Sequence, residues 1–126
     1  MKYKLVQRKN PQKPAEPGKW YPQAINAGRV TVKQIVTDIS GRSSLTRGDI
    51  NNVLDNFLDR LPAYLMLGHS VQLGSFGTIR LSITGEGVDT KEKYNAKKMN
   101  PPKVVFTPGV DFKNNLDEIT FDLVTE

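Results

Sequence analysis

The sequence has no cysteine, one histidine and one tryptophan among its 126 residues. The absence of cysteine excludes disulfides, thiolate nucleophiles and thiolate metal sites, and it is typical of a reducing cytoplasm. No apolar run approaches the roughly 20 residues of a membrane-spanning helix, and the basic N-terminus lacks the apolar segment of a signal peptide. We therefore expect a soluble cytoplasmic protein that does not bind a membrane.

Residues that commonly perform catalysis are equally scarce. His69 lies between a glycine and a serine in a turn that precedes a strand, whereas a general base or a metal site needs further partners. Neither Gly74-Ser-Phe-Gly77 nor Gly85-x-Gly87 matches a catalytic serine elbow or a dinucleotide fingerprint. We therefore expect no enzymatic activity, no cofactor, no metal site and no small-molecule substrate.

The positive charge is distributed unevenly along the chain. Residues 1–34 contain eight Lys or Arg against one acidic residue, and residues 85–103 contain five lysines against three acidic residues. Residues 35–84 are balanced at four against four, and residues 104–126 are acidic, with one lysine against five. Because phosphate contacts dominate non-specific affinity for DNA, this asymmetry favours a polyanionic partner. A merely solvated surface is the alternative.

Two amphipathic helices are predicted in the first half of the chain. Thr31 is the expected N-cap of the first, which ends near Ser40-Gly41. Thr46-Arg-Gly-Asp49 is a capping-box pattern that begins the second. The apolar stripe of this second helix comprises Ile50, Val53, Leu54, Phe57, Leu58, Leu61 and Leu65. Pro62 predicts a kink or an end near Leu61, and so many large side chains predict a partner subunit that covers them.

The segment that follows has the two-residue period of an antiparallel strand. Apolar residues alternate with polar ones from Val71 to Ile83, and Gly74 and Gly77 provide the glycines that a tight turn needs. Arg80 lies on the polar face of this pattern. After a polar, lysine-containing stretch, residues 103–107 predict a return strand and residues 110–118 predict a short helix.

The two ends of the chain extend beyond this unit. Residues 1–8 predict a short strand, and residues 9–22, which contain four of the eight prolines, predict an extended linker. Trp20 and Tyr21 within that linker are expected to pack on the core, and contact with nucleic acid is the alternative. Residues 119–123 predict a terminal strand that pairs with residues 1–8, in a register that the sequence leaves open.

The order of these elements resembles that of the HU/IHF family of bacterial histone-like DNA-binding proteins. Residues 31–118 carry the resemblance, above all Gly68-His-Ser-Val-Gln-Leu-Gly-Ser-Phe-Gly-Thr78 and Phe106-Thr-Pro-Gly109. The proline-rich front end resembles the N-terminal extension of HU-like variants found in Bacteroidetes. The resemblance implies an α+β, IHF-like DNA-binding fold. Its parts are an N-terminal helical hairpin, an antiparallel sheet with a protruding β-ribbon arm, and a short C-terminal helix.

The resemblance also implies how the chain is divided and what it binds. It predicts an N-terminal strand and proline-rich extension over residues 1–30, an HU-like DNA-binding domain over residues 31–118 with its arm at about 82–103, and a strand-like tail over residues 119–126. The family's plan is an intertwined homodimer in the cytoplasmic nucleoid that binds double-stranded DNA largely without sequence specificity and bends or compacts it. On this plan, the residues expected to face the core are Ile79, Leu81, Val104 and Phe106. The expected DNA-binding residues are Arg80, Lys91, Lys93, Lys97, Lys98 and Lys103.

The sequence departs from the family pattern in the arm. Ser82 and Thr84 stand where typical members have arginines, and the tip lacks the Arg-Asn-Pro motif whose proline wedges between base steps. We therefore expect phosphate contacts rather than strong kinking, with Tyr94 and Met99 as candidate wedges. The alternative function is that of an HU-fold dimer that acts as a structural or protein-interaction module and does not bind nucleic acid.

Overall fold

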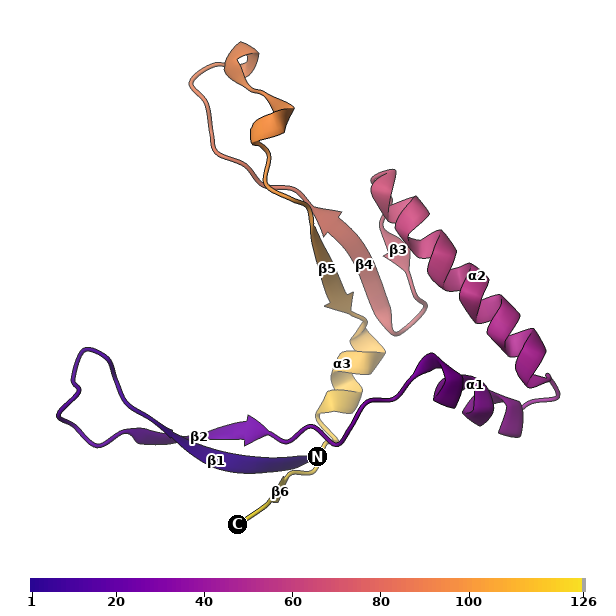
Figure 1. The fold of residues 1–126 in the computed structure, drawn as a ribbon, viewed down its shortest axis with the longest axis horizontal. Helices are drawn as coiled ribbons and strands as arrows, with labels where there is room; N and C mark the ends of the chain where they lie inside the picture. Colours follow the sequence, from indigo (N-terminus) through magenta and orange to yellow (C-terminus); the bar gives the residue numbers. More distant parts are fainter. Residues whose placement is uncertain (126) are drawn as a thin grey trace.

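The structure is a computed structural model that describes residues 1–125 (Figure 1). The strands are β1 (Lys2–Arg8), β2 (Lys19–Ala24), β3 (Val71–Gln72), β4 (Gly77–Ser82), β5 (Lys103–Pro108) and β6 (Asp122–Leu123). The α-helices are α1 (Val32–Gly41), α2 (Arg47–Met66) and α3 (Val110–Leu116). Two single 3₁₀ turns, Lys91–Lys93 and Ala96–Lys98, lie between β4 and β5. The predicted mixture of helices and strands is confirmed.

The strands form two small sheets, with the orders β2-β1-β6 and β3-β4-β5. β1 and β2 are antiparallel, from Tyr3 opposite Ala24 to Arg8 opposite Lys19. β1 and β6 are parallel, with Tyr3 opposite Leu123. The predicted pairing between the two ends of the chain is therefore confirmed, and its register is now defined.

The order of elements differs from the expected one, because the helical hairpin α1–α2 does not come first. A β-hairpin precedes it, since residues 19–24 form the strand β2 and not the end of an extended linker. β2 is an edge strand, which tolerates Pro22, and aromatic residues favour the extended conformation. The prediction that Trp20 and Tyr21 pack on the core is wrong, because their side chains are 62% and 42% exposed.

Both predicted helix caps are confirmed. The Thr31 hydroxyl accepts a hydrogen bond from the Gln34 backbone N–H at 3.3 Å, and the Gln34 side chain accepts one in return from the Thr31 N–H at 2.8 Å. The Thr46 hydroxyl likewise accepts from the Asp49 N–H at 3.2 Å. Each cap satisfies donors that a helix otherwise leaves unpaired, so local sequence determines where α1 and α2 begin.

Pro62 predicted a kink or an end of the second helix near Leu61; an end there is wrong, because α2 continues through Pro62 to Met66. Proline removes one hydrogen bond from a helix interior. Here Pro62 lies with the buried Leu65 on an apolar face beside β4 and β5. Pro62 itself is exposed, and the helix is continuous on both sides of it.

A tight turn connects β3 to β4 as predicted. The Leu73 N–H donates to the Gly77 carbonyl oxygen at 2.7 Å, and Gly74 and Gly77 have positive φ values of 57° and 155°. At Gly77, a Cβ atom would come within 2.5 Å of the Thr107 carbonyl oxygen. Glycine is therefore required at this position, both for its backbone conformation and for the close approach of β5.

An aromatic cluster joins this turn to β5 and α3. The Phe76 ring lies 5.1 Å from that of Phe106 and 4.9 Å from that of Phe112, measured between centroids. Such aromatic pairs add to the free energy gained from burial alone. The cluster therefore anchors the short final helix, which was predicted over residues 110–118 and extends over Val110–Leu116.

Two ribbons extend from the helical body, the hairpin β1–β2 and the long connection between β4 and β5 (Figure 1). Within the residues described, the buried apolar core consists of Val36, Ile50 and Leu65. So small a core leaves many large apolar side chains of the helices and of the second sheet exposed. The single chain is therefore an open structure with uncovered apolar surface.

Candidate nucleic-acid interface

The base of the arm is a regular antiparallel ladder. β4 and β5 pair from Gly77 opposite Pro108 to Ser82 opposite Lys103. Beyond that point, the Asn100 backbone N–H donates to the Thr84 carbonyl oxygen at 2.9 Å, and the Asn100 side-chain amide donates to the Thr84 hydroxyl at 3.2 Å. These two bonds hold the strands of the arm together where the regular ladder has ended.

The register of the ladder separates a polar face from an apolar one. Residues opposite each other in an antiparallel pair share a face, and neighbours along a strand alternate. Ser82 pairs with Lys103, and Arg80, two residues earlier in β4, shares their face. Two of the predicted DNA-binding residues, Arg80 and Lys103, therefore lie on one surface, and both are exposed.

The opposite face carries the four residues expected to face the core. Ile79 pairs with Phe106, and Leu81 pairs with Val104, so the predicted alternation is confirmed. Ile79 and Leu81 are half-buried. Val104 is 69% exposed and Phe106 is 40% exposed in the single chain, so β5 contributes much less to the core of one chain than expected.

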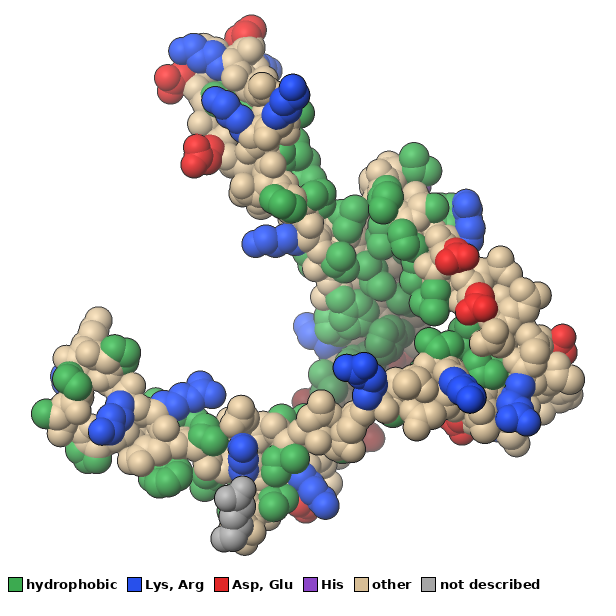
Figure 2. All heavy atoms as spheres, viewed as in Figure 1, with side chains coloured by type: hydrophobic (Ala, Val, Ile, Leu, Met, Phe, Trp, Pro, Cys, Tyr) green, Lys and Arg blue, Asp and Glu red, His purple; other side chains and the backbone are tan. Residues whose placement is uncertain are grey.

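The remaining predicted site residues lie at the tip of the arm. Lys91 and Lys93 are on the first 3₁₀ turn, and Lys97 and Lys98 are on the second. All four are exposed, and none takes part in an ion pair within residues 1–125. Three acidic residues lie at the same tip: Glu86, Asp89 and Glu92. Figure 2 shows side chains of both charges there.

The candidate wedge residues are turned back on the arm. The Tyr94 hydroxyl lies against Gly85, where a Cβ atom would come within 2.7 Å of it. Met99 is half-buried and forms an isolated bridge with Gly85. Both side chains therefore pack where the ladder of the arm ends.

An open apolar groove of about 310 Å³ lies between α2 and the base of the arm. Its lining includes Leu58, Leu61, Leu65, Met66, Leu81 and Val104. Figure 2 shows apolar side chains gathered over this region of the molecule. Met66, at the end of α2, is 79% exposed. Apolar surface of this kind, left open on one chain, is typical of a surface that another element covers.

Among residues 1–125, no three or more His, Cys, Asp and Glu residues gather where they could hold a metal ion. His69 is exposed, and its backbone N–H donates to the Tyr64 carbonyl oxygen at 3.2 Å. Over the same part of the chain, no helix is both long enough and apolar enough to cross a bilayer.

Taken together, two capped helices, two small sheets and a ribbon with exposed lysines define an α+β protein of the HU type. A family model described as an HU domain fused to wHTH, Ig, or Glycine-rich motif (HU-HIG) matches residues 1–122. The chain belongs to this HU-HIG family, and the resemblance noted in its sequence is confirmed. A comparison with curated protein sequences finds no match.

Two solved structures share the fold. One is a Bacteroides vulgatus protein described as a candidate bacterial DNA-binding protein, with a TM-score of 0.64 and 14% identity; the match covers 98% of this chain and 47% of that chain. The other is Anabaena HU in a cocrystal with DNA, with a TM-score of 0.52 and 17% identity, covering 69% of this chain and 97% of that one. The chain thus spans about half the length of the Bacteroides protein.

Proposed function

We propose that the protein is an architectural DNA-binding protein that binds duplex DNA largely without sequence specificity and bends or compacts it. The observation that carries this proposal is the arm of an HU-family chain. Arg80 and Lys103 share one face of its ladder, and four exposed lysines lie beyond the ladder at the tip. Cationic side chains of this kind contact phosphates, which position a protein on DNA but carry no sequence information.

The packing of the arm favours binding without an inserted wedge. The Tyr94 hydroxyl lies against Gly85 while the side chain is 40% exposed, and Met99 is half-buried, so neither side chain projects freely from the arm. Kinking by insertion requires an apolar side chain that projects between base steps. Any bend would therefore come from phosphate contacts made along the curved path of the duplex.

We further propose that two copies form a homodimer through the apolar groove between α2 and the arm base. Leu58, Met66 and Val104 are 46%, 79% and 69% exposed there. Burial of apolar surface is favourable by about 25 cal/mol per Å², and the core of one chain is small. A second copy would place two arms on one duplex, and such a dimer would work in the cytoplasmic nucleoid. We also propose that the HU-like domain spans residues 31–118, between an N-terminal extension over residues 1–30 and a tail over residues 119–126.

One observation favours a second candidate function, an HU-fold dimer that binds no nucleic acid. Glu86, Asp89 and Glu92 share the tip with the four lysines, so the net charge there is small. A surface of mixed charge also suits a protein partner. Duplex binding distinguishes the two functions.

The experiment is fluorescence anisotropy with two labelled duplexes of unrelated sequence. The arm variant has four substitutions: Lys91→Gln, Lys93→Gln, Lys97→Gln and Lys98→Gln. The helix control has three, all on or beside the helical hairpin: Lys33→Gln, Arg42→Gln and Arg47→Gln. We expect the wild-type protein and the helix control to bind both duplexes with similar affinity, and the arm variant to bind at least about tenfold more weakly. Absence of binding by the wild-type protein at low salt would contradict the proposal and favour the second candidate.

A further inference from the structure

One face of the hairpin β1–β2 carries cations around a central Val6–Tyr21 pair, and the other face is mainly apolar. Its register places Arg8 opposite Lys19 and Lys4 opposite Gln23. Because residues two apart on a strand share a face, Lys4, Arg8 and Lys19 lie on the same side of the sheet. Leu5, opposite Pro22, belongs to the other side, where it lines an open apolar pocket together with Tyr3 and Phe121. We call the first of these sides the hairpin cationic face.

Two cations of this face, Arg8 and Lys19, lower the stability of the hairpin. Arg8 and Lys19 stand directly opposite each other, and like charges in that position destabilise a sheet. Neither forms an ion pair within residues 1–125. The Arg8 guanidinium instead lies over the Tyr21 ring, 5.8 Å from its centroid. Such an arrangement becomes favourable when a polyanion approaches the face.

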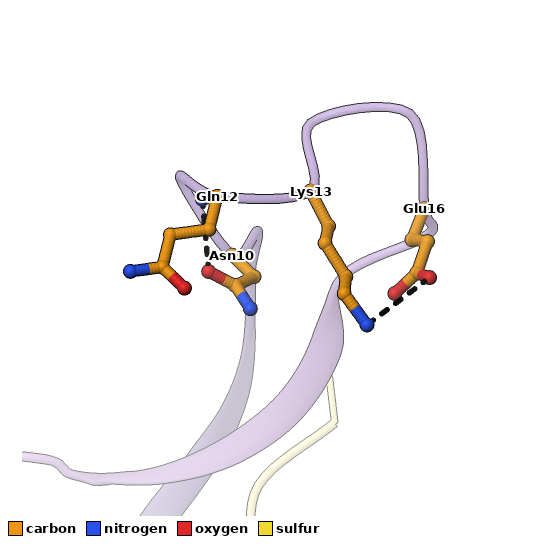
Figure 3. Close-up of polar contacts among 4 residues, drawn as sticks. All are labelled: Asn10, Gln12, Lys13 and Glu16. Carbon is orange, nitrogen blue, oxygen red and sulfur yellow. Dashed lines mark hydrogen bonds and ion pairs between the residues drawn. The ribbon is translucent and has the colours of Figure 1, made fainter.

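The loop at the end of the hairpin extends the cationic surface. It surrounds an open hollow of about 520 Å³ whose lining includes Arg8, Lys9, Lys19 and Tyr21. Figure 3 shows that the Lys13 side chain points toward Glu16, with 3.9 Å between its Nζ and the Glu16 carboxylate. Within residues 1–125, Arg8, Lys9 and Lys19 therefore line the hollow without an ion pair, beside the Lys13–Glu16 pair.

Backbone hydrogen bonds give this loop a defined shape. The Asn10 side-chain oxygen accepts from the Gln12 N–H at 3.0 Å (Figure 3). The Asn10 carbonyl oxygen accepts from the Lys13 N–H at 3.0 Å, and the Lys13 carbonyl oxygen accepts from the Glu16 N–H at 3.1 Å. At the start of β2, the Gln7 side-chain amide donates to the Gly18 carbonyl oxygen at 3.0 Å. The cations at this end are thus carried on a backbone with its own hydrogen bonds.

We infer that the hairpin cationic face is a second DNA-binding surface, which contacts phosphates of the duplex through Lys4, Arg8 and Lys19. The inference rests on the proposed function, because it assumes that duplex DNA is the ligand. Lys4 and Arg8 are about 13 Å apart along β1, a spacing that reaches more than one phosphate. Figure 1 shows the hairpin and the arm as separate ribbons, so the hairpin adds contacts that the arm does not make.

An anionic membrane is the other polyanionic surface that a basic ribbon could meet. Binding at a bilayer interface requires the apolar side chains to face the lipid. On the cationic face, Val6 is half-buried and Tyr21 lies under the Arg8 guanidinium. The more exposed apolar side chains, Leu5 and Trp20, lie on the side opposite the charges. This separation favours the phosphates of a duplex over a lipid surface.

The test compares the salt dependence of duplex binding among full-length variants. The hairpin variant has three substitutions: Lys4→Gln, Arg8→Gln and Lys19→Gln. The helix control defined above removes the same charge elsewhere. Each phosphate contact contributes about −0.9 to the slope of log affinity against log salt. We expect the slope of the hairpin variant to be shallower by about 2 to 3 per subunit, and that of the helix control to equal the wild-type slope.

Two further measurements separate loss of contacts from loss of structure. Trp20, the single tryptophan, lies on β2, so an unchanged near-ultraviolet circular dichroism spectrum shows that the variant hairpin still forms. A charge-conserving variant provides the rescue: Lys4→Arg, Arg8→Lys and Lys19→Arg. We expect it to restore the wild-type slope, since non-specific phosphate contacts depend mainly on charge.

The outcomes distinguish this inference from the proposed function. If the arm variant loses affinity while the hairpin variant keeps the wild-type slope, the inference is wrong and the proposed function stands. If the wild-type protein does not bind duplex DNA, both are wrong. Binding of the wild-type protein, but not of the hairpin variant, to vesicles of phosphatidylserine and phosphatidylcholine, with no change in duplex binding, would overturn the inference in favour of a membrane.

Discussion

The two ribbons of this molecule hold their cations in different ways. In the hairpin β1–β2, Lys4, Arg8 and Lys19 lie on one continuous ladder. In the arm, Arg80 and Lys103 lie on the ladder, and the lysines beyond them lie on single 3₁₀ turns beside acidic residues. A ladder fixes each side chain through backbone hydrogen bonds, whereas segments with few such bonds open at a lower free energy. The hairpin thus presents charge at fixed spacing, whereas the lysines of the arm tip lie on short segments outside the ladder.

The largest expected effect comes from the glycine at the base of the arm. Gly77→Val would place a Cβ atom within 2.5 Å of the Thr107 carbonyl oxygen, at a φ of 155°. Strain and overpacking each cost about 1–3 kcal/mol, so we expect the free energy of unfolding to fall by about 3 kcal/mol or more. Thermal or urea unfolding followed by circular dichroism measures this change.

Gly18 provides the matched comparison in the other ribbon. A Cβ there would come within 2.5 Å of the Arg8 carbonyl oxygen, but the position lies at the end of the hairpin, away from the body. We expect Gly18→Ala to alter the emission of Trp20 while the main unfolding transition stays within about 1 kcal/mol of wild type. An equal loss from both substitutions would show that the two ribbons unfold as one unit.

A further prediction concerns the apolar face of the arm base, which we propose as the dimer interface. Val104 is 69% exposed on the apolar face of the arm base, so Val104→Asp should change the folding of one chain little. It should weaken self-association by at least about tenfold, because it places a charge in the proposed dimer interface. Sedimentation velocity over a range of concentrations measures the effect. Val30→Asp, at a site of similar exposure outside the groove, is the control, and equal behaviour of the two variants would contradict the dimer.

A smaller effect is expected where the ladder of the arm ends. Asn100→Ala removes the side-chain hydrogen bond to Thr84 but keeps the backbone bond between the same residues. An exposed hydrogen bond of this kind contributes about 1 kcal/mol or less. Hydrogen exchange should therefore become faster for the amides at the arm tip and remain unchanged in the hairpin. Unchanged exchange at the tip would show that this bond does not hold the arm.

The smallest expected effect is that of Lys19→Glu, which should stabilise the hairpin slightly and weaken duplex binding. Lys19→Glu places an acid opposite Arg8, which replaces like charges by an opposite pair. Since the pair is exposed, we expect the hairpin to gain only a few tenths of a kcal/mol, seen as later melting of the Trp20 signal. Duplex affinity should fall at the same time. Stronger binding by this variant would contradict the role assigned to the hairpin cationic face.

Local chemistry determines which features the sequence predicts. The caps at Thr31 and Thr46, and the turn at Gly74 and Gly77, depend on residues within a few positions of each other, and all are confirmed. The alternation of β4 is equally local. These features needed no knowledge of the rest of the chain.

Features that depend on distant contacts were predicted wrongly or incompletely. Prolines on both sides of Trp20 suggested a linker, yet pairing with β1 makes residues 19–24 a strand. Pro62 suggested a kink or a helix end, yet α2 continues to Met66. The hairpin cationic face was missed for the same reason. Its signal was present in the excess of Lys and Arg over residues 1–34, but only the register places Arg8 beside Lys19 on one face.

The salt dependence of duplex affinity tests the central claim most directly, because it counts the phosphates that the cationic ribbons neutralise. We predict a linear fall of log affinity with log salt for the wild-type protein, and a slope shallower by up to about 3 to 4 per subunit for the arm variant. A wild-type affinity that does not change with salt, or an arm variant with the wild-type slope, would contradict the account.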